Sequence, residues 1–417
     1  MKILKLTPAL EKRLLLARQQ RDVKAERVAA RIVADVRRRG DSAVSAWTKK
    51  LDGIDLSDAG VWISRRDINA AAASVAKDFL RAVEHAAKNV RLVAQNQLPQ
   101  PWTMEVEPGL TIKQVVRPID TIGCYIPGGR HALLSTLIMT VVPAQVAAVP
   151  RIVVVCPRPN PELLAAAHLL GVKEIARIGG AQAIGALAYG TKTMPRVEKI
   201  FGPGNRYVTA AKHFVSSDCA IDLPAGPTEA IVLATKGNVR WIAADLLAQA
   251  EHAPDAGSFF VTTSKALAEK VQAEVGTQLQ KLARTNPAHV SISRSGAIIL
   301  APSIAAACQF VNRFAPEHLS LPTDAAILLN KCEAAGTIFV GPWAAQPLGD
   351  YASGSNHVLP TAGWARRRGG LGTSDFVKCI SVQFIQRQGF ARLANDVQTL
   401  ARAEGLQAHV NAVEVRR

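Results

Sequence analysis

The chain has 417 residues, of which 48% are hydrophobic and 20% are charged. A chain of this length can bury more than one core, and an ordinary charged fraction argues against disorder, so we expect at least two folded domains. The net charge is +17, but the basic residues are scattered and aromatic residues make up only 5%. This pattern argues against a specific nucleic-acid site and favours a basic, solvated surface able to attract anionic ligands.

The sequence gives no sign of a membrane segment or of secretion. No apolar run is long enough to cross a bilayer, and residues 1–20 lack the apolar core and cleavage site of a signal peptide. The six cysteines are scattered and form no CxxC pair, so neither a disulfide framework nor a zinc ribbon is indicated. We therefore expect a cytoplasmic protein that contacts no membrane.

The N-terminal part of the chain predicts helices. In residues 7–50, apolar side chains recur at helical spacing among Lys, Arg and Glu, with a break at Gly40. A second helical run covers about residues 68–96 and ends before Pro99. A polar linker is then expected to lead to Ile112.

Residues 115–222 alternate between short apolar runs and helical patterns, which is typical of parallel βαβ units. The expected strands lie at 152–156, 174–178 and 198–201, and the expected helices at 161–170, 182–189 and 204–214. Glycine-rich loops follow strands at 123–129, 179–182 and 202–205. Backbone N–H groups in such loops suit a phosphate, although none of the loops matches GxGxxG and each, taken singly, is more often just a tight turn.

A second α/β region runs through residues 229–376. Its expected strands lie at 231–233, 259–262, 297–300 and 337–340, and its expected helices at 241–252 and 264–283. The tail from residue 375 is expected to be helical to about Gly405 and extended beyond it. The similar alternation in the two regions predicts an α/β protein with two related domains.

Two short segments concentrate residues suited to proton transfer or metal binding. Glu317 and His318 follow a proline and could supply two proton-transfer groups at one point, with a solvated turn as the alternative. Gln249 and His252 lie three residues apart at a helix end, where they share one face and suit a divalent metal. The alternative for His252 is that it caps its helix.

Two further polar segments lie nearer the C-terminus. Asp350 and His357 lie in a glycine-flanked polar loop shaped for a ligand, although Asp350 is equally consistent with a turn-forming residue. Glu404 and His409 lie in the tail, where residues are usually frayed and dispensable unless the tail docks on something.

Taken in order along the chain, these segments resemble the histidinol dehydrogenase family. The matching motifs span essentially the whole chain and are Gly128-Gly129 with Tyr125, Gly180-Ala-Gln182, Phe201-Gly-Pro-Gly-Asn205, Ala225-Gly-Pro-Thr-Glu229, Gln249-Ala-Glu-His252, Ala315-Pro-Glu-His-Leu319, Gly349-Asp-Tyr-Ala-Ser-Gly354, Asn356-His-Val-Leu-Pro-Thr361 and the segment from Glu404 to His409. Each motif is weak alone, but the set is highly specific. The resemblance implies oxidation of L-histidinol to L-histidine through the aldehyde, with reduction of two NAD molecules.

The resemblance also implies roles for individual residues. His318 would take the alcohol proton and assist again in the second oxidation, and Glu317 would activate the water that hydrates the aldehyde. The implied Zn2+ ligands are Gln249, His252, Asp350 and His409; the implied NAD contacts are Tyr125, Gln182 and Asn205; and the implied substrate contacts are Thr228, Gln249, His252, His318, Asp350, His357, Glu404 and His409. In this family the tail crosses to the partner subunit, so Glu404 and His409 would complete the other protomer's site in a homodimer.

The resemblance further implies two incomplete Rossmann-like α/β domains with helical N- and C-terminal extensions. The expected parts are residues 1–20 as an N-terminal helical extension, 21–118 with 227–372 as the first domain carrying zinc and the acid–base pair, 119–226 as the second, NAD-binding domain, and 373–417 as the tail.

The sequence departs from the family pattern in three respects. Thr228 stands where biosynthetic members usually carry Ser, Ala253 stands where Gly is usual, and the chain is far more basic than typical members. Relatives oxidise other small alcohols, so the alternative is a paralogous zinc and NAD dehydrogenase of another amino alcohol or of a sulfonated diol. A non-catalytic or nucleic-acid-binding protein would predict a degraded acid–base pair and metal set, which the sequence does not show.

Overall fold

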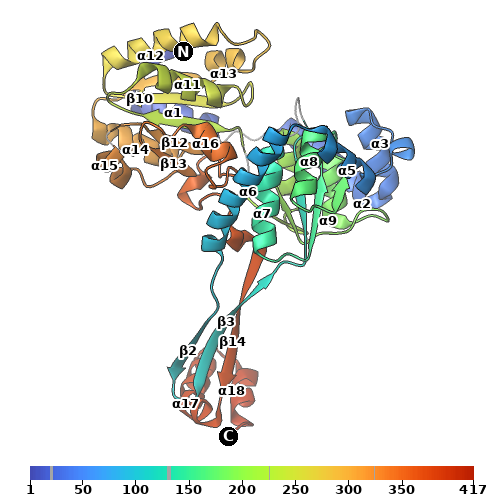
Figure 1. The fold of residues 1–417 in the computed structure, drawn as a ribbon. Helices are drawn as coiled ribbons and strands as arrows, with labels where there is room; N and C mark the ends of the chain where they lie inside the picture. The colour runs from blue at the N-terminus through green and yellow to red at the C-terminus, as the bar shows by residue number, and fades with distance from the viewer. Residues whose placement is uncertain (19–21, 129–132, 225, 324) are drawn as a thin grey trace.

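The computed structural model describes residues 1–18, 22–128, 133–224, 226–323 and 325–417. Two lobes, each built on a parallel sheet, lie next to each other, and a long arm extends from them to the C-terminus (Figure 1). This architecture confirms the expected α/β class. Within the described ranges, no helix combines the length and the apolar character needed to span a membrane.

The first lobe contains a six-stranded sheet in which all neighbouring strands are parallel. In spatial order its strands are β1 (Lys2–Lys5), β11 (Gly296–Leu300), β10 (Gly257–Thr262), β9 (Glu229–Leu233), β12 (His318–Leu321) and β13 (Thr337–Val340). Its helices are α1 (Pro8–Ala17), α11 (Val239–Ala250), α12 (Lys265–Leu279), α13 (Ala288–Arg294), α14 (Ile304–Phe314), α15 (Ala325–Leu328) and α16 (Gln346–Tyr351).

Both faces of this sheet are buried, which explains its nearly continuous apolar strands. In β9, Ile231 and Leu233 join the core beneath α1 and α14, whereas Val232 joins the core beneath α11 and α12. Successive side chains of the strand point to opposite faces of the sheet, so they pack into two cores, one on each side.

The second lobe contains a five-stranded parallel sheet. In spatial order its strands are β6 (Glu174–Ala176), β5 (Arg151–Val155), β4 (Thr121–Tyr125), β7 (Lys199–Phe201) and β8 (Ala220–Ile221). Its helices are α2 (Val23–Arg39), α3 (Asp41–Asp52), α4 (Leu56–Ala59), α5 (Arg65–Ser74), α6 (Lys77–Gln97), α7 (Leu134–Val146), α8 (Pro161–Leu169), α9 (Gly180–Tyr189) and α10 (Arg206–Val215). Helices α2, α3, α9 and α10 share one core, and α5 to α8 share the other.

These contacts differ from the expected domain boundaries. Residues 21–118 were assigned to the domain that carries zinc, but Ile32, Val33 and Val36 of α2 are buried with α9 and α10 of the second lobe. Residues 1–20 were expected to form a helical extension, but Lys2–Lys5 forms the edge strand β1 beside β11. The chain therefore begins in one lobe, builds the other and returns, a path that local patterns do not reveal.

The arm is an antiparallel sheet that ends in two helices. Strand β3 (Leu110–Pro118) lies between β2 (Trp102–Glu107) and β14 (Val377–Ile385), and α17 (Arg387–Ala403) and α18 (Gln407–Glu414) form the tip (Figure 1). Three predictions are therefore wrong: the segment before Ile112 contains strand β2 and is not only a linker, the tail begins with strand β14 and not with a helix, and it ends in helix α18 and is not extended. The linker sequence misled because β2 is exposed along most of its length and carries no core pattern.

Candidate active site at the junction of the lobes

Glu317 and His318 stand at the amino end of β12. Helix α14 ends at Phe314, Ala315 adopts the left-handed conformation with φ of 49°, and the chain turns through Pro316 into the strand. Glu317 is 7% exposed and His318 is 3% exposed. The pair is therefore a buried pair of titratable groups, and the solvated-turn reading is wrong.

The carboxylate of Glu317 is held from the neighbouring strand β9. Its Oε2 accepts hydrogen bonds from the hydroxyl of Thr228 and from the backbone N–H of Glu229, the latter at 3.0 Å. Burial raises the pKa of Glu317, and these two donors and the nearby His318 oppose the rise. A carboxylate with a raised pKa is a stronger base than an exposed one.

His318 lies between two carboxylates. Its Nδ1 is 3.8 Å from Glu317 Oε2 and its Nε2 is 3.5 Å from Asp350 Oδ1. Burial alone would lower the pKa of the imidazole, but the two carboxylates outweigh burial and raise it. Both ring nitrogens are buried and make no hydrogen bond to a described residue. Buried polar groups are usually hydrogen-bonded, so an imidazole flanked by two carboxylates at these longer distances is a candidate for contact with a ligand.

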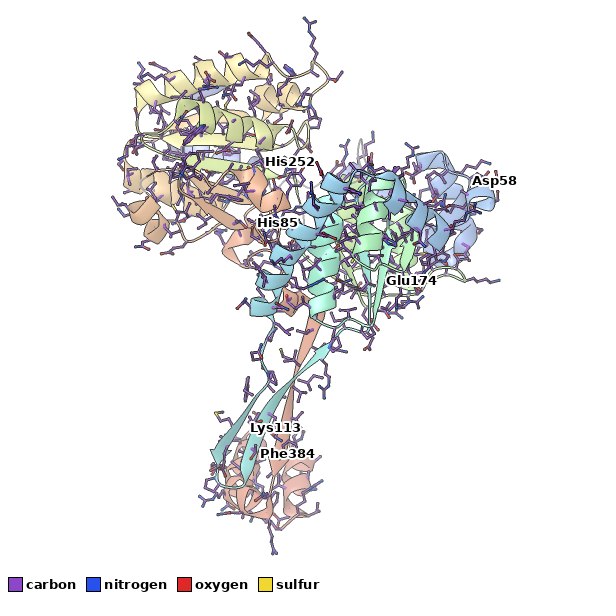
Figure 2. The ribbon with its side chains drawn as sticks, viewed as in Figure 1. Asp58, His85, Lys113, Glu174, His252 and Phe384 are labelled. Atoms are coloured by element: carbon purple, nitrogen blue, oxygen red, sulfur yellow. The ribbon has the colours of Figure 1, made fainter. Side chains whose placement is uncertain are left out.

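Three of the four expected zinc ligands converge beside this pair. Gln249 ends α11, His252 follows it, and Asp350 lies in α16, with His252 Nε2 3.8 Å from Asp350 Oδ2. Figure 2 shows His252 on the side of the first lobe that faces the second. Asp350 was expected in a polar loop but lies in a short helix, and its neighbouring histidines hold its pKa below the usual value although burial opposes them.

The donor geometry of His252 suits a metal. Its Nδ1 lies 3.0 Å from the main-chain oxygen of Ala248, which can only accept, so Nδ1 carries a proton. Nε2 is left on the side of Asp350, and a histidine that bonds a main-chain oxygen through one ring nitrogen can bind a metal through the other. The capping contact and the ligand role are thus compatible. No group of three or more His, Cys, Asp or Glu side chains suited to a metal gathers within the described part of the chain.

The tail residues stand apart from this cluster. Glu404 and His409 are exposed, and α18, which carries His409, lies at the tip of the arm, away from α11 and α16 (Figure 1). Within one chain, the structure therefore brings together Gln249, His252 and Asp350 but leaves His409 outside.

His357 links the cluster to the second lobe. Its Nδ1 is 2.8 Å from the main-chain oxygen of Asp350, and its Nε2 is 3.2 Å from the hydroxyl of Thr136 in α7. Burial lowers the pKa of His357, which favours the neutral ring. The site therefore lies where the amino ends of β9 and β12 meet the second lobe.

The expected NAD contacts lie at the carboxyl ends of strands in the second lobe, as the rule for parallel sheets predicts. The Tyr125 hydroxyl accepts from Gly180 N–H at 3.2 Å, and Asn205 caps α10. Gln182 donates to Asp52 at 3.0 Å, while its buried Oε1 has no partner among the described residues. Of the glycine-rich loops, Gly129 falls outside the described residues, as does Ala225 of the motif that holds Thr228.

Comparison with known proteins shows the family. The profile of the histidinol dehydrogenase family matches residues 16–417. The chain belongs to the histidinol dehydrogenase family. The histidinol dehydrogenase of Aquifex aeolicus (strain VF5) is 43% identical, covering 94% of this chain and 92% of that protein. The histidinol dehydrogenase of Vibrio cholerae serotype O1 is 44% identical, covering 93% and 90%. A crystal structure of histidinol dehydrogenase from Elizabethkingia anophelis superposes with a TM-score of 0.92 at 36% identity, covering 100% of this chain and 98% of that one.

The histidinol dehydrogenase match includes the arm as well as the lobes, because it extends to residue 417. The structure also shows side chains around the site that sequence reasoning missed. Gln346 is buried and donates to Gln249 Oε1 at 2.6 Å, and Asp52 bonds Gln182. Arg18 forms a buried ion pair with Glu229. No local pattern points to these residues, since each acts across a long sequence separation.

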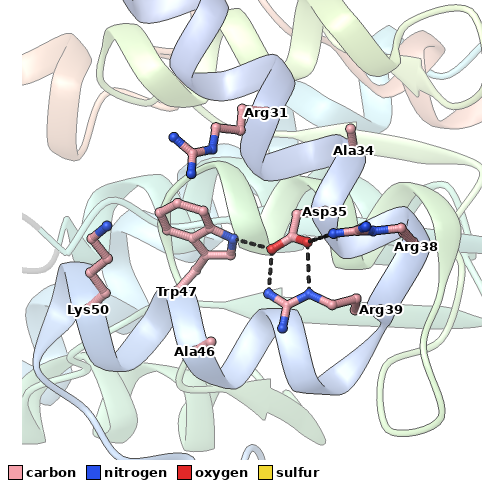
Figure 3. A pocket seen from close by; sticks show the side chains of 8 residues that line it. All are labelled: Arg31, Ala34, Asp35, Arg38, Arg39, Ala46, Trp47 and Lys50. Atoms are coloured by element: carbon pink, nitrogen blue, oxygen red, sulfur yellow. Dashed lines mark hydrogen bonds and ion pairs between the residues drawn. The ribbon is translucent and has the colours of Figure 1, made fainter.

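One further cavity lies away from the histidinol dehydrogenase motifs. A pocket of about 730 Å³ opens between α2 and α3 and is lined by Arg31, Ala34, Asp35, Arg38, Arg39, Ala46, Trp47 and Lys50 (Figure 3). Asp35 pairs with Arg38 and Arg39 and accepts from the Trp47 indole at 2.9 Å. The pocket is a basic surface feature without contact to the site residues.

Proposed function

We propose that the chain oxidises L-histidinol to L-histidine with NAD as the hydride acceptor and Zn2+ as the bound metal. In balanced form, the alcohol and one NAD give the aldehyde, NADH and one proton. The aldehyde, water and a second NAD then give the carboxylate, NADH and two protons. The observation that supports this most is the buried imidazole of His318, which lies between the carboxylates of Glu317 and Asp350 and makes no hydrogen bond to a described residue.

His318 supplies the base for the first oxidation. An alcohol must lose its proton as hydride leaves its carbon, and an imidazole with its pKa raised by two carboxylates accepts that proton readily. Because the neighbouring carboxylates stabilise the imidazolium that forms, the proton is retained near the site until it passes to solvent.

Glu317 supplies the base for the second oxidation. Hydration of the aldehyde requires water to lose a proton as it attacks the carbonyl carbon. The Thr228 hydroxyl and the Glu229 N–H hold Oε2, which orients the carboxylate and leaves Oε1 for the water.

Gln249, His252 and Asp350 would hold the metal together with His409 of a second chain. A zinc ion, when bound, supplies a Lewis acid that orients the substrate and is itself redox-inert. The free Nε2 of His252 and the low pKa of Asp350 fit this role. Tyr125, Gln182 and Asn205 would line the NAD site on the facing lobe.

A homodimer accounts for the arm. Its side chains include exposed apolar residues on two strands, namely Trp102, Met104, Val106, Ile380 and Phe384, with Phe384 facing Lys113 of the neighbouring strand (Figure 2). Exposed apolar surface of this kind marks an interface. A second copy covering this surface would bring the other arm, with Glu404 and His409, to the lobes of this chain.

A count of NADH per substrate tests the proposal. Metal-replete protein with excess NAD should form two NADH for each L-histidinol consumed, and His318→Asn should abolish most of this turnover while its zinc content stays unchanged. No turnover of histidinol, with turnover of a sulfonated diol or another amino alcohol instead, would assign the chain to the alternative substrate class. DNA binding with strong salt dependence and no NADH from any alcohol would refute enzyme function altogether.

A further inference from the structure

A buried ion pair lies directly behind Glu317. Arg18 follows α1 and pairs with Glu229 at the start of β9, and the two side chains are 8% and 6% exposed. Burying a charged pair costs desolvation free energy that its mutual attraction only partly recovers. Stability alone therefore does not explain this pair, whereas the contacts of both partners around Glu317 indicate a structural role beside that residue.

The guanidinium of Arg18 holds the turn that leads into Glu317. It stacks on the Phe314 ring at 3.8 Å from the ring centre, and it donates to the main-chain oxygens of Phe314 and Ala315, the latter at 3.5 Å. These are the last carbonyls of α14 and its cap, which a cation satisfies and stabilises. Because Ala315 is in the left-handed conformation, its turn needs such outside support.

The carboxylate of Glu229 holds the other side of Glu317. It accepts from Arg18 and from the backbone N–H of Ala362 at 3.1 Å. Its own backbone N–H donates to Glu317 Oε2 at 3.0 Å. Burial raises the pKa of Glu229, the Arg18 guanidinium opposes that rise, and the nearby Glu317 adds to it. The ion pair thus contacts both the chain that precedes Glu317 and the strand that binds its carboxylate.

We propose that Arg18 and Glu229 are positioning residues that aim the carboxylate of Glu317 at the water used in the second oxidation. This inference rests on the proposed function, since it presupposes that Glu317 is the base for water. Neither residue is assigned to substrate, NAD or zinc. Arginine suits the task because its planar fork reaches two carbonyls and a carboxylate at once, whereas a lysine is a single point charge.

The proposal predicts a selective defect. Arg18→Met and Glu229→Gln should each lower the rate of L-histidinaldehyde oxidation roughly 10- to 100-fold, because misplacement of a catalytic group by about 1 Å has effects of this size. Formation of the first NADH from L-histidinol depends on His318 and should fall much less. With an aldehyde-trapping amine present, NADH per histidinol should drop from two towards one.

The chain offers a matched control. Glu11 and Arg313 also join α1 to α14 by an ion pair, but this pair lies at the surface and does not contact the turn before Glu317. Arg313→Met should weaken the contact between the two helices and leave the ratio of the two oxidation rates at the wild-type value. Arg18→Lys, which keeps the charge without the fork, should recover part of the aldehyde oxidation rate.

The experiment distinguishes failure of the positioning role from failure of the proposed function. A selective loss of aldehyde oxidation in Arg18→Met and Glu229→Gln, absent in Arg313→Met, supports the positioning role. Equal loss of both oxidations, or no loss in either, overturns it while the proposed function stands. If Arg18→Met does not fold, Glu229→Gln, which keeps the side-chain shape, decides the question alone. A wild-type chain that oxidises neither compound would refute the proposed function and this inference with it.

Discussion

The hydroxyl of Thr228 donates a hydrogen bond to the carboxylate of Glu317. The same oxygen accepts from Gln249 Nε2 at 2.9 Å. Thr228 therefore connects the proposed water-activating base to a proposed zinc ligand, and its methyl group is the only addition relative to the Ser that the family resemblance leads us to expect here. Both hydrogen bonds use the hydroxyl group, which Thr and Ser share, so either residue could form them.

Removal of this hydroxyl should impair catalysis, whereas removal of the methyl should not. Thr228→Val keeps the side-chain shape but removes one hydrogen bond from Glu317 Oε2 and the hydrogen bond of Gln249 Nε2. We expect kcat/KM to fall roughly 10- to 100-fold, as for loss of a hydrogen bond to a charged group. Thr228→Ser is the matched control and should stay within a few-fold of wild type. Steady-state rates for both variants with L-histidinol check this, and equal rates for Val and Ser would contradict it.

The buried amide of Gln346 should raise the affinity for zinc, although it is not itself a proposed ligand. Its donation to Gln249 Oε1 at 2.6 Å orients that ligand. Gln346→Met should weaken zinc affinity roughly 10- to 100-fold, as loss of groups behind metal ligands usually does. At saturating zinc, kcat should return close to wild type. Titration with a competing chelator measures the affinity, and an unchanged affinity would remove Gln346 from the account.

Asp245 in α11 should contribute to the pH dependence of the free energy of unfolding. Burial raises the pKa of this carboxyl to about 6 from an ordinary value of 3.8. The folded state then binds more protons than the unfolded state between these values, so stability falls as pH rises from about 4 to about 6 and stays reduced above that. Asp245→Asn should therefore raise the free energy of unfolding at pH 8 by about 1–3 kcal/mol, with no gain near pH 4.

Asp396→Asn, which changes an exposed carboxylate of α17, is the control for this experiment and should alter neither end of the profile. Urea unfolding of the two variants at pH 4 and pH 8 measures the difference. A gain for Asp245→Asn that is the same at both pH values would show that charge burial is not its source.

How much the sequence could predict follows from the range of the interactions involved. The buried strand at 152–156 and the helices around it were predictable because alternation in a parallel sheet is a local pattern; the structure has β5 at Arg151–Val155. The arm was not, because β14 pairs with β3 across more than half the chain and neither strand has a continuous buried face. The roles of Glu317, His318 and the ligands came from motif resemblance. Arg18, whose carboxylate and carbonyl partners are remote in sequence, carried no local signal.

The proposed homodimer can be tested by combining two inactive variants. If Glu404 and His409 act in the partner's site, then each site combines the lobes of one chain with the tail of the other. His318→Asn and His409→Ala should each be inactive as homodimers, the first by roughly 100-fold or more for loss of the general base and the second through loss of a proposed zinc ligand. In a mixed dimer, however, one site would hold both defects and the other site neither.

Co-expression of these two variants, followed by measurement of NADH formation from L-histidinol, shows whether each active site combines residues of two chains. Random pairing makes half of the dimers mixed, and half of the sites in a mixed dimer are intact, so activity should recover to about one quarter of wild type. Activity no higher than that of the separate variants would contradict the account, because it would mean that His318 and His409 must belong to one chain.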